Sequence, residues 1–125
     1  MVADEYLVWN QDLGNQLGTR IRVAGTTAAR RNGLLGVREL PEGHGVWIAP
    51  CEAVHTFRMR IPIDVIFLDR SYRVRKLVPH MKPSRVAVCF SACSVLEMNA
   101  GAISASGVQV GDTLRFEALK QEANL

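Results

Sequence analysis

One short apolar run limits the folds that this chain can adopt. Residues 64–68 read Asp64-Val65-Ile66-Phe67-Leu68 and are apolar after the first position. A run this short and this continuous is typical of a strand that is buried on both faces of a sheet. The polar residues 69–72 and the strand-like residues 73–78 follow directly, so the sequence predicts a central antiparallel hairpin.

Other short segments have the composition of strands and are separated by turn residues. We expect these strands at residues 6–10, 19–24, 46–49, 86–90, 94–98 and 113–118. Two segments read as helices, a main one from about Thr27 to Leu35 and a short one within residues 99–106. A length of 125 residues suits one domain, residues 1–125. The predicted fold class is α+β, with a curved, mostly antiparallel, barrel-like sheet, one main helix and a second short helix.

Charge and cysteine content restrict the environment and the partners. The net charge is +3, with 15 Lys and Arg against 12 Asp and Glu, which gives a weak preference for anions. No apolar run reaches the roughly 18 residues that indicate a membrane span. The first residues lack the basic and apolar regions of a signal peptide, so the expected compartment is cytoplasmic; a leader removed upstream would instead mean export. Three cysteines, an odd number, predict buried thiols rather than a disulfide framework.

Residues 51–64 gather more groups able to react or to ligate a metal than any other segment. They contain the thiol of Cys51, the imidazole of His55, the thioether of Met59 and the carboxyl of Asp64. Alternation along the segment predicts a strand with one inward face, made of Cys51, Ala53, His55, Phe57, Met59 and Ile61. In a strand, residues four positions apart are separated by about 13 Å. Cys51 and His55 could therefore share a metal or a proton only if the chain turns between them.

Two kinds of function fit this segment. The leading hypothesis is a non-enzymatic domain that binds a small molecule or a peptide end, in a pocket lined by His55, Thr56, Met59, Asp64 and Cys51. The alternative is a hydrolase or transferase that uses Cys51, His55 and Asp64, with Cys51 as nucleophile and His55 as base, or a metal held by Cys51 and His55. Because zinc-type spacings and nucleotide-binding motifs are missing from the sequence, we predict no metal and no cofactor. In a purely structural interpretation, Cys51 and His55 are core residues and Asp64 accepts backbone N–H groups.

Arginines supply a third hypothesis, that of an interaction domain. Arg58, Arg60, Arg73 and Arg75 lie on strand-like segments that could be neighbours, and they would then form one face for an acidic partner. Nucleic acid is not expected as the partner, because no set of aromatic residues is interleaved with these cations.

Glu97 is a carboxyl within a predicted strand. It stands between Leu96 and Met98 and is expected to point away from the face that they share. We expect it to pair with an arginine, either Arg30 or Arg38.

Four motifs in order resemble those of a known family. They are Arg30-x-x-Gly33-Leu34-Leu35-Gly36-x-Arg38, His55-Thr56-x-x-Met59-x-x-Pro62-Ile63-Asp64, Val95-Leu96-Glu97-x-x-Ala100-Gly101 and Gly111-Asp112. Over about residues 17–118 the chain resembles the family catalogued as domain of unknown function 192, and Cys51 ahead of His55 resembles one of its subgroups. The resemblance implies a compact, β-rich α+β domain and no particular reaction. Many members carry an N-terminal signal, from which this chain departs.

Overall fold

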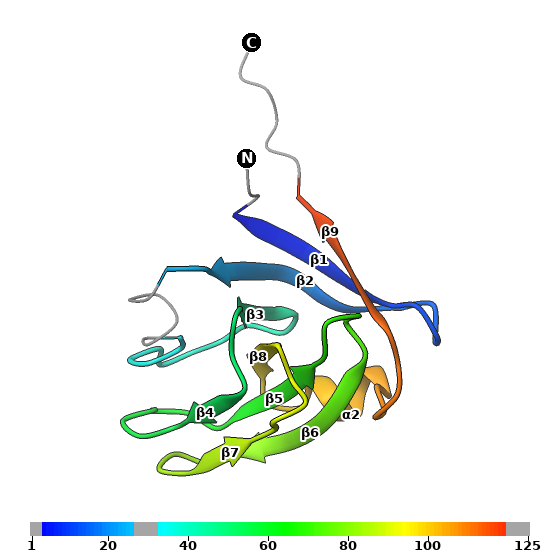
Figure 1. The fold of residues 1–125 in the computed structure, drawn as a ribbon. Helices are drawn as coiled ribbons and strands as arrows, with labels where there is room; N and C mark the ends of the chain where they lie inside the picture. The colour runs from blue at the N-terminus through cyan, green and yellow to red at the C-terminus, as the bar shows by residue number, and fades with distance from the viewer. Residues whose placement is uncertain (1–3, 27–32, 120–125) are drawn as a thin grey trace.

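The computed structural model describes residues 4–26 and 33–119 and consists mostly of β-strands (Figure 1). The strands are β1 (Glu5–Asn10), β2 (Asn15–Ala24), β3 (His44–Ile48), β4 (Ala53–His55), β5 (Ile63–Leu68), β6 (Val74–Met81), β7 (Val86–Val88), β8 (Ser94–Asn99) and β9 (Leu114–Ala118). One short helix, α2 (Ala102–Ser106), follows β8. The strands form a seven-stranded sheet of order β6-β5-β8-β3-β2-β1-β9 and a two-stranded sheet of β4 and β7.

The large sheet curls into a half-barrel. Its pairings are antiparallel except for that of β2 with β3, which is parallel. The two edge strands approach each other at one end, where Arg73 and Thr113 form an isolated bridge. There the amide of Leu114 donates to the carbonyl of Tyr72 at 2.9 Å, and the amide of Val74 donates to the carbonyl of Asp112 at 2.8 Å. These bonds join the two edges of the sheet at that end.

The predicted central hairpin is confirmed. All six residues of β5 are buried, and β5 lies between β6 and β8. Val65 and Phe67 belong to one hydrophobic cluster, whereas Ile66 and Leu68 belong to a second cluster on the other face of the sheet. Both faces of β5 are therefore covered, which explains why its sequence is continuously apolar.

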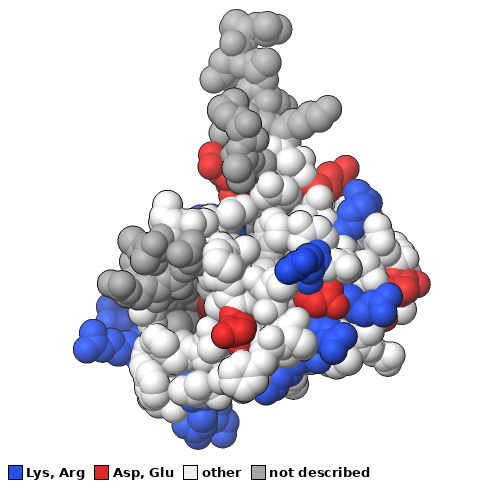
Figure 2. All heavy atoms as spheres, in the orientation of Figure 1, with Lys and Arg blue, Asp and Glu red and all other residues white. Residues whose placement is uncertain are grey.

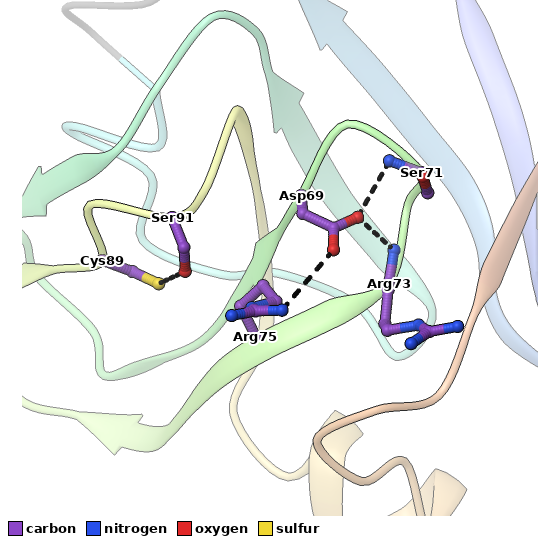
Figure 3. A network of polar contacts seen from close by, with 6 residues as sticks. All are labelled: Asp69, Ser71, Arg73, Arg75, Cys89 and Ser91. Carbon is purple, nitrogen blue, oxygen red and sulfur yellow. Dashed lines mark hydrogen bonds and ion pairs between the residues drawn. The ribbon is translucent and has the colours of Figure 1, made fainter.

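Asp69 shapes the turn of this hairpin, as Figure 3 shows. Its Oδ1 atom accepts the amide of Ser71 at 2.8 Å and the amide of Arg73 at 3.1 Å. Its other oxygen lies 4.0 Å from the guanidinium of Arg75. An aspartate whose carboxylate accepts the amides of residues a few positions later in the chain commonly fixes a tight turn.

The α+β prediction is only partly correct. The short helix within residues 99–106 is confirmed as α2. Most of the predicted main helix, residues 27–32, lies outside the described residues, and residues 33–36 form turns rather than helix. Gly33 and Gly36 have φ angles of 47° and 80°, a left-handed conformation that does not continue a helix. The described part of the chain is a mostly β fold.

The strand predicted over residues 51–61 is found only over Ala53–His55. Only Ala53–His55 pair as a strand, and the inward residues are Val54, Thr56 and Met59 rather than Ala53, His55 and Phe57. The chain turns after His55, where the amide of Met59 donates to the carbonyl of Thr56 at 3.1 Å and Arg58 has a φ of 66°. This turn ends the alternation of inward and outward side chains. Among the residues after β4 that were predicted to face inward, Met59 is the one that is buried.

Candidate functional site

A cavity of about 210 Å³ lies between the turn after residue 32 and the strands β3, β4 and β8. Most of its lining is apolar or contains sulfur, and a single carboxyl group joins it. The lining residues are Gly33, Leu34, Leu35, Ile48, Cys51, Ala53, Val54, His55, Met59 and Glu97. Three of the five predicted site residues, Cys51, His55 and Met59, are thus brought to one cavity.

Cys51 and His55 occupy different parts of this wall. Cys51 is half-buried, and its Sγ atom donates to the carbonyl of Ala53 at 3.1 Å. His55 is exposed, and its ring stacks on Phe57 with the ring centres 5.3 Å apart. The expectation of an inward His55 is therefore corrected: β4 turns Val54 toward the core and His55 outward. No hydrogen bond within the described part of the chain joins the thiol to the imidazole.

Thr56 does not line the cavity. It is fully buried, and its hydroxyl donates to the carbonyl of Lys82 at 2.6 Å and accepts the amide of Arg85 at 2.9 Å. Its backbone amide also donates to the carbonyl of Arg85 at 2.8 Å. The polar atoms of Thr56 hold two loops together and are not directed at the cavity.

Asp64 is fully buried in β5, and the cavity lining does not include it. Its two carboxylate oxygens accept the amides of His80 and Ile103, each at 2.8 Å. A buried carboxylate without such donors would be strongly destabilising, so these bonds account for its presence. They tie β5 to the end of β6 and to α2, in agreement with the structural interpretation of this residue.

Glu97 is the cavity residue that the sequence analysis did not assign to a site. It lies in β8 and is only 7 % exposed, on the opposite face from Leu96 and Met98, as predicted. Burial raises the pKa of its carboxyl from 4.5 to about 7, because the charged form is separated from water. Its sequence signal is a charged residue between apolar neighbours in a buried strand, which is rare without a partner or a role.

The arginine partner expected for Glu97 is not found in the described part of the chain. Arg38 is exposed and forms no ion pair with Glu97, and Arg30 lies outside the described residues. Gly33 approaches the carboxyl instead. A Cβ atom at this position would lie 3.0 Å from Oε1 of Glu97, so the absence of a side chain makes room for the carboxyl.

The four arginines of the predicted face do not form one patch. Ile63 pairs with Met81 at one end of the β5–β6 hairpin, and Leu68 pairs with Val74 at the other end. Arg58 and Arg60 lie just before the first end, whereas Arg73 and Arg75 lie at the second end. A strand rises by about 3.3 Å per residue, so the two pairs are roughly 20 Å apart along the hairpin. The prediction of a single face is therefore wrong.

The three cysteines lie near one another without a disulfide between any of them. The amide of Cys51 donates to the carbonyl of Cys93 at 2.9 Å, and the amide of Cys89 donates to the carbonyl of Glu52 at 2.8 Å. The thiol of Cys89 contacts the hydroxyl of Ser91 at 3.4 Å (Figure 3). Within residues 4–26 and 33–119, no group of three His, Cys, Asp or Glu side chains could hold a metal ion. None of the helices in these ranges is long and apolar enough to cross a membrane.

Comparison with known families agrees with this architecture. The model of the family DUF192, described as an uncharacterized ACR, matches residues 9–116. The chain belongs to DUF192. The matched region contains every described cavity residue, so the cavity is part of the DUF192 domain. None of the curated proteins matches the chain.

Two solved structures have a fold similar to that of this DUF192 chain. A protein of Sinorhizobium meliloti 1021, named as a candidate transcription regulator, is 21% identical with a TM-score of 0.81, over 93% of this chain and 96% of the other. A protein of unknown function from Novosphingobium aromaticivorans DSM 12444 is 24% identical with a TM-score of 0.77, over 89% of this chain and 83% of the other. At these identities the likeness extends to the fold alone.

Proposed function

We propose that this DUF192 domain is a small-ligand binding domain whose ligand carries a basic or hydrogen-bond-donating group into the cavity beside Cys51, His55 and Met59. The observation that carries the proposal is the carboxyl of Glu97, which lines the cavity, is more than nine-tenths buried and forms no ion pair with a described residue.

Burying a carboxyl group in apolar surroundings is unfavourable unless a donor or a cation is supplied. Within the described part of the chain no side chain forms an ion pair with Glu97, and its neighbours in the cavity wall include the apolar Leu34, Ile48 and Val54. A ligand with an amine or amide N–H group would satisfy the carboxyl and would stabilise its ionised form. The apolar part of such a ligand would also gain from leaving water, since Leu34, Ile48 and Val54 belong to the wall.

The volume of the cavity and the sulfur atoms in its wall suit a small ligand. The volume of about 210 Å³ is below the roughly 300–1,000 Å³ of pockets that hold drug-sized molecules. Met59 and Cys51 offer polarizable sulfur atoms that adapt to an apolar group. A short amine or the amino end of a peptide would fit both the volume and the carboxyl.

The proposal is tested with n-butylamine and with leucinamide, which copies the amino end of a peptide. The methyl resonance of Met59 is followed by NMR, and the methyl of Met98 serves as an internal reference because it lies in the hydrophobic cluster on the other face of the sheet. We expect both amines to shift the Met59 signal and to leave Met98 unchanged. The Glu97→Gln variant should respond more weakly, because a neutral amide can accept a hydrogen bond from an ammonium group but forms no ion pair with it.

The same titration can contradict the proposal. If n-butyrate shifts Met59 as strongly as n-butylamine does, the carboxyl of Glu97 does not select the ligand. If none of the three probes shifts Met59, while the protein remains folded, the cavity does not bind small ligands of this class.

A further inference from the structure

Two neighbouring loops carry an exposed surface whose side chains do not line the cavity. Of the residues in these loops, Met59 is buried and belongs to the cavity lining. One loop follows β4 and the other connects β6 to β7. Thr56 joins the two through its hydroxyl, and the amide of Ser84 adds a bond to the carbonyl of Thr56 at 2.9 Å. We define the loop surface as six exposed side chains from these loops and from the first position of β7; they are Phe57, Arg58, Arg60, Lys82, Arg85 and Val86.

The loop surface is strongly cationic. Its four basic residues are all exposed, and none forms an ion pair with another described residue. The sequence contains no Asp or Glu between residues 53 and 63 or between residues 70 and 96. Figure 2 shows Lys and Arg side chains projecting at the lower left of the molecule, in the region where Figure 1 places the ends of β4 and β7.

Apolar side chains stand among these cations. Phe57 is 48% exposed and Val86 is 61% exposed. Val86 pairs with His55 across the small sheet, and the ring of His55 stacks on Phe57, so the two apolar groups lie on neighbouring parts of the same end. The loop surface therefore combines exposed apolar side chains with exposed cations.

The loops are held in shape before any partner arrives. Arg58 and Ser84 have φ angles of 66° and 64°, which non-glycine residues seldom adopt, and the bonds of Thr56 lie between them. Backbone of this kind persists only where the surrounding contacts fix it, and it occurs often at binding sites. The loop surface is therefore presented as a fixed arrangement.

We propose that the loop surface docks on the anionic surface of a lipid bilayer, with Phe57 and Val86 entering the interface and the four cations facing lipid phosphates and carboxylates. Apolar side chains flanked by Lys and Arg suit this boundary, because the apolar part enters the lipid while the charged ends remain at the headgroups. The proposal does not depend on the cavity or on its ligand.

Other anionic partners fit less well. A stable protein interface uses roughly 20–30 residues on each side, and the loop surface offers far fewer. Single-stranded nucleic acid is held by successive aromatic platforms along a basic groove, whereas this end has one stacked pair, His55 and Phe57. A planar anionic surface needs neither a matched groove nor a series of rings.

The test is co-sedimentation of the full chain with vesicles of phosphatidylcholine that contain phosphatidylserine, against vesicles of phosphatidylcholine alone. We expect binding to the anionic vesicles only, and loss of binding as salt is raised. Each cation near such a surface contributes about five-fold in partitioning, so the double variant Arg58→Gln with Arg60→Gln should bind roughly 25-fold more weakly. Phe57→Ser should also weaken binding, with the charge unchanged.

The matched control is Arg70→Gln with Arg73→Gln, which removes two exposed arginines at the far end of the β5–β6 hairpin. This control should bind vesicles within about two-fold of the unaltered chain, since its charges lie away from the loop surface. Equal losses in the two double variants would overturn the proposal, as would equal binding to neutral vesicles. Binding to a single-stranded oligonucleotide without binding to anionic vesicles would overturn it in favour of nucleic acid. Glu97→Gln should bind vesicles normally, which separates this test from that of the cavity.

Discussion

The hydroxyl of Thr56 donates a hydrogen bond of 2.6 Å to the carbonyl of Lys82, across 26 positions of sequence. The same oxygen accepts the amide of Arg85, so one buried side chain satisfies a donor and an acceptor of the opposite loop. In Thr56→Val the shape is kept, but both backbone groups lose their partner. We expect the free energy of unfolding to fall by about 2 kcal/mol. Urea unfolding measures this change, and amide exchange at Arg85 should become faster.

Thr56→Ser is the control for this prediction, because it retains the hydroxyl and removes only a methyl group. Its amide exchange at Arg85 should stay close to that of the unaltered chain. If Ser and Val variants behave alike, the hydroxyl is not what joins the two loops.

Glu97 gives the protein a pH-dependent stability. Its pKa is about 7 in the folded state and 4.5 ordinarily, so the folded state binds the proton more tightly. The contribution to stability is complete below pH 4.5 and is lost as the pH rises through 7. Glu97→Gln cannot ionise and should be more stable than the unaltered chain at pH 8, by an amount of the order of 3 kcal/mol, with little difference at pH 4.

The measurement is urea unfolding of both proteins at several pH values from 4 to 8. A difference between them that does not grow with pH would show that Glu97 titrates normally. A bound cationic ligand would reduce the difference at pH 8, since it stabilises the ionised carboxyl.

Gly33 and Gly36 form a matched pair that separates backbone strain from crowding. Both have positive φ angles, but an added Cβ at Gly33 would lie 3.0 Å from Oε1 of Glu97, whereas at Gly36 it would meet nothing within 4 Å. Each alanine substitution should cost about 1 kcal/mol through its left-handed backbone. Only Gly33→Ala should also weaken the Met59 response to n-butylamine. Equal responses in the two variants would mean that Gly33 is not needed to keep the carboxyl accessible.

Asp64→Asn tests the buried carboxylate of β5. An amide replaces one acceptor oxygen by a donor, which then faces the N–H group of His80 or of Ile103. The expected loss of stability is about 2–3 kcal/mol. Asp69→Asn serves as the comparison, because Asn can keep one acceptor for the two amides that share Oδ1 of Asp69. Thermal unfolding should rank Asp64→Asn as the more damaging of the two.

The sequence predicts well those parts of the fold that are determined by residues close together in the chain. The hairpin around Asp69 follows from a continuous apolar run and a polar turn, both of which are visible within fifteen residues. The short helix α2 is likewise bounded by glycines, at Gly101 and Gly107. Membership of DUF192 could also be stated from its motifs, and the family match confirms it.

The candidate site was predicted less well because its geometry depends on distant contacts. Alternation along residues 51–61 suggested one strand, yet only Ala53–His55 pair, with β7, and there Val54 faces inward. After His55 the chain turns, and the bonds of Thr56 join this turn to the loop at 82–85. Glu97 joins Cys51 and Met59 only because β8 pairs with β3 and β5 in the sheet. Pairing between strands so far apart in sequence leaves no periodic signal in either segment.

The pairing of Tyr6 with Ala118 has a consequence for how the molecule is made. Strand β9 is the outer neighbour of β1 in the sheet, so β1 remains an open edge during synthesis until residues 114–118 have been produced. Contacts of such long sequence separation form slowly. Completion of the sheet therefore waits for residues 114–118, and an emerging chain that stops before Leu114 would expose β1 to pairing with other molecules.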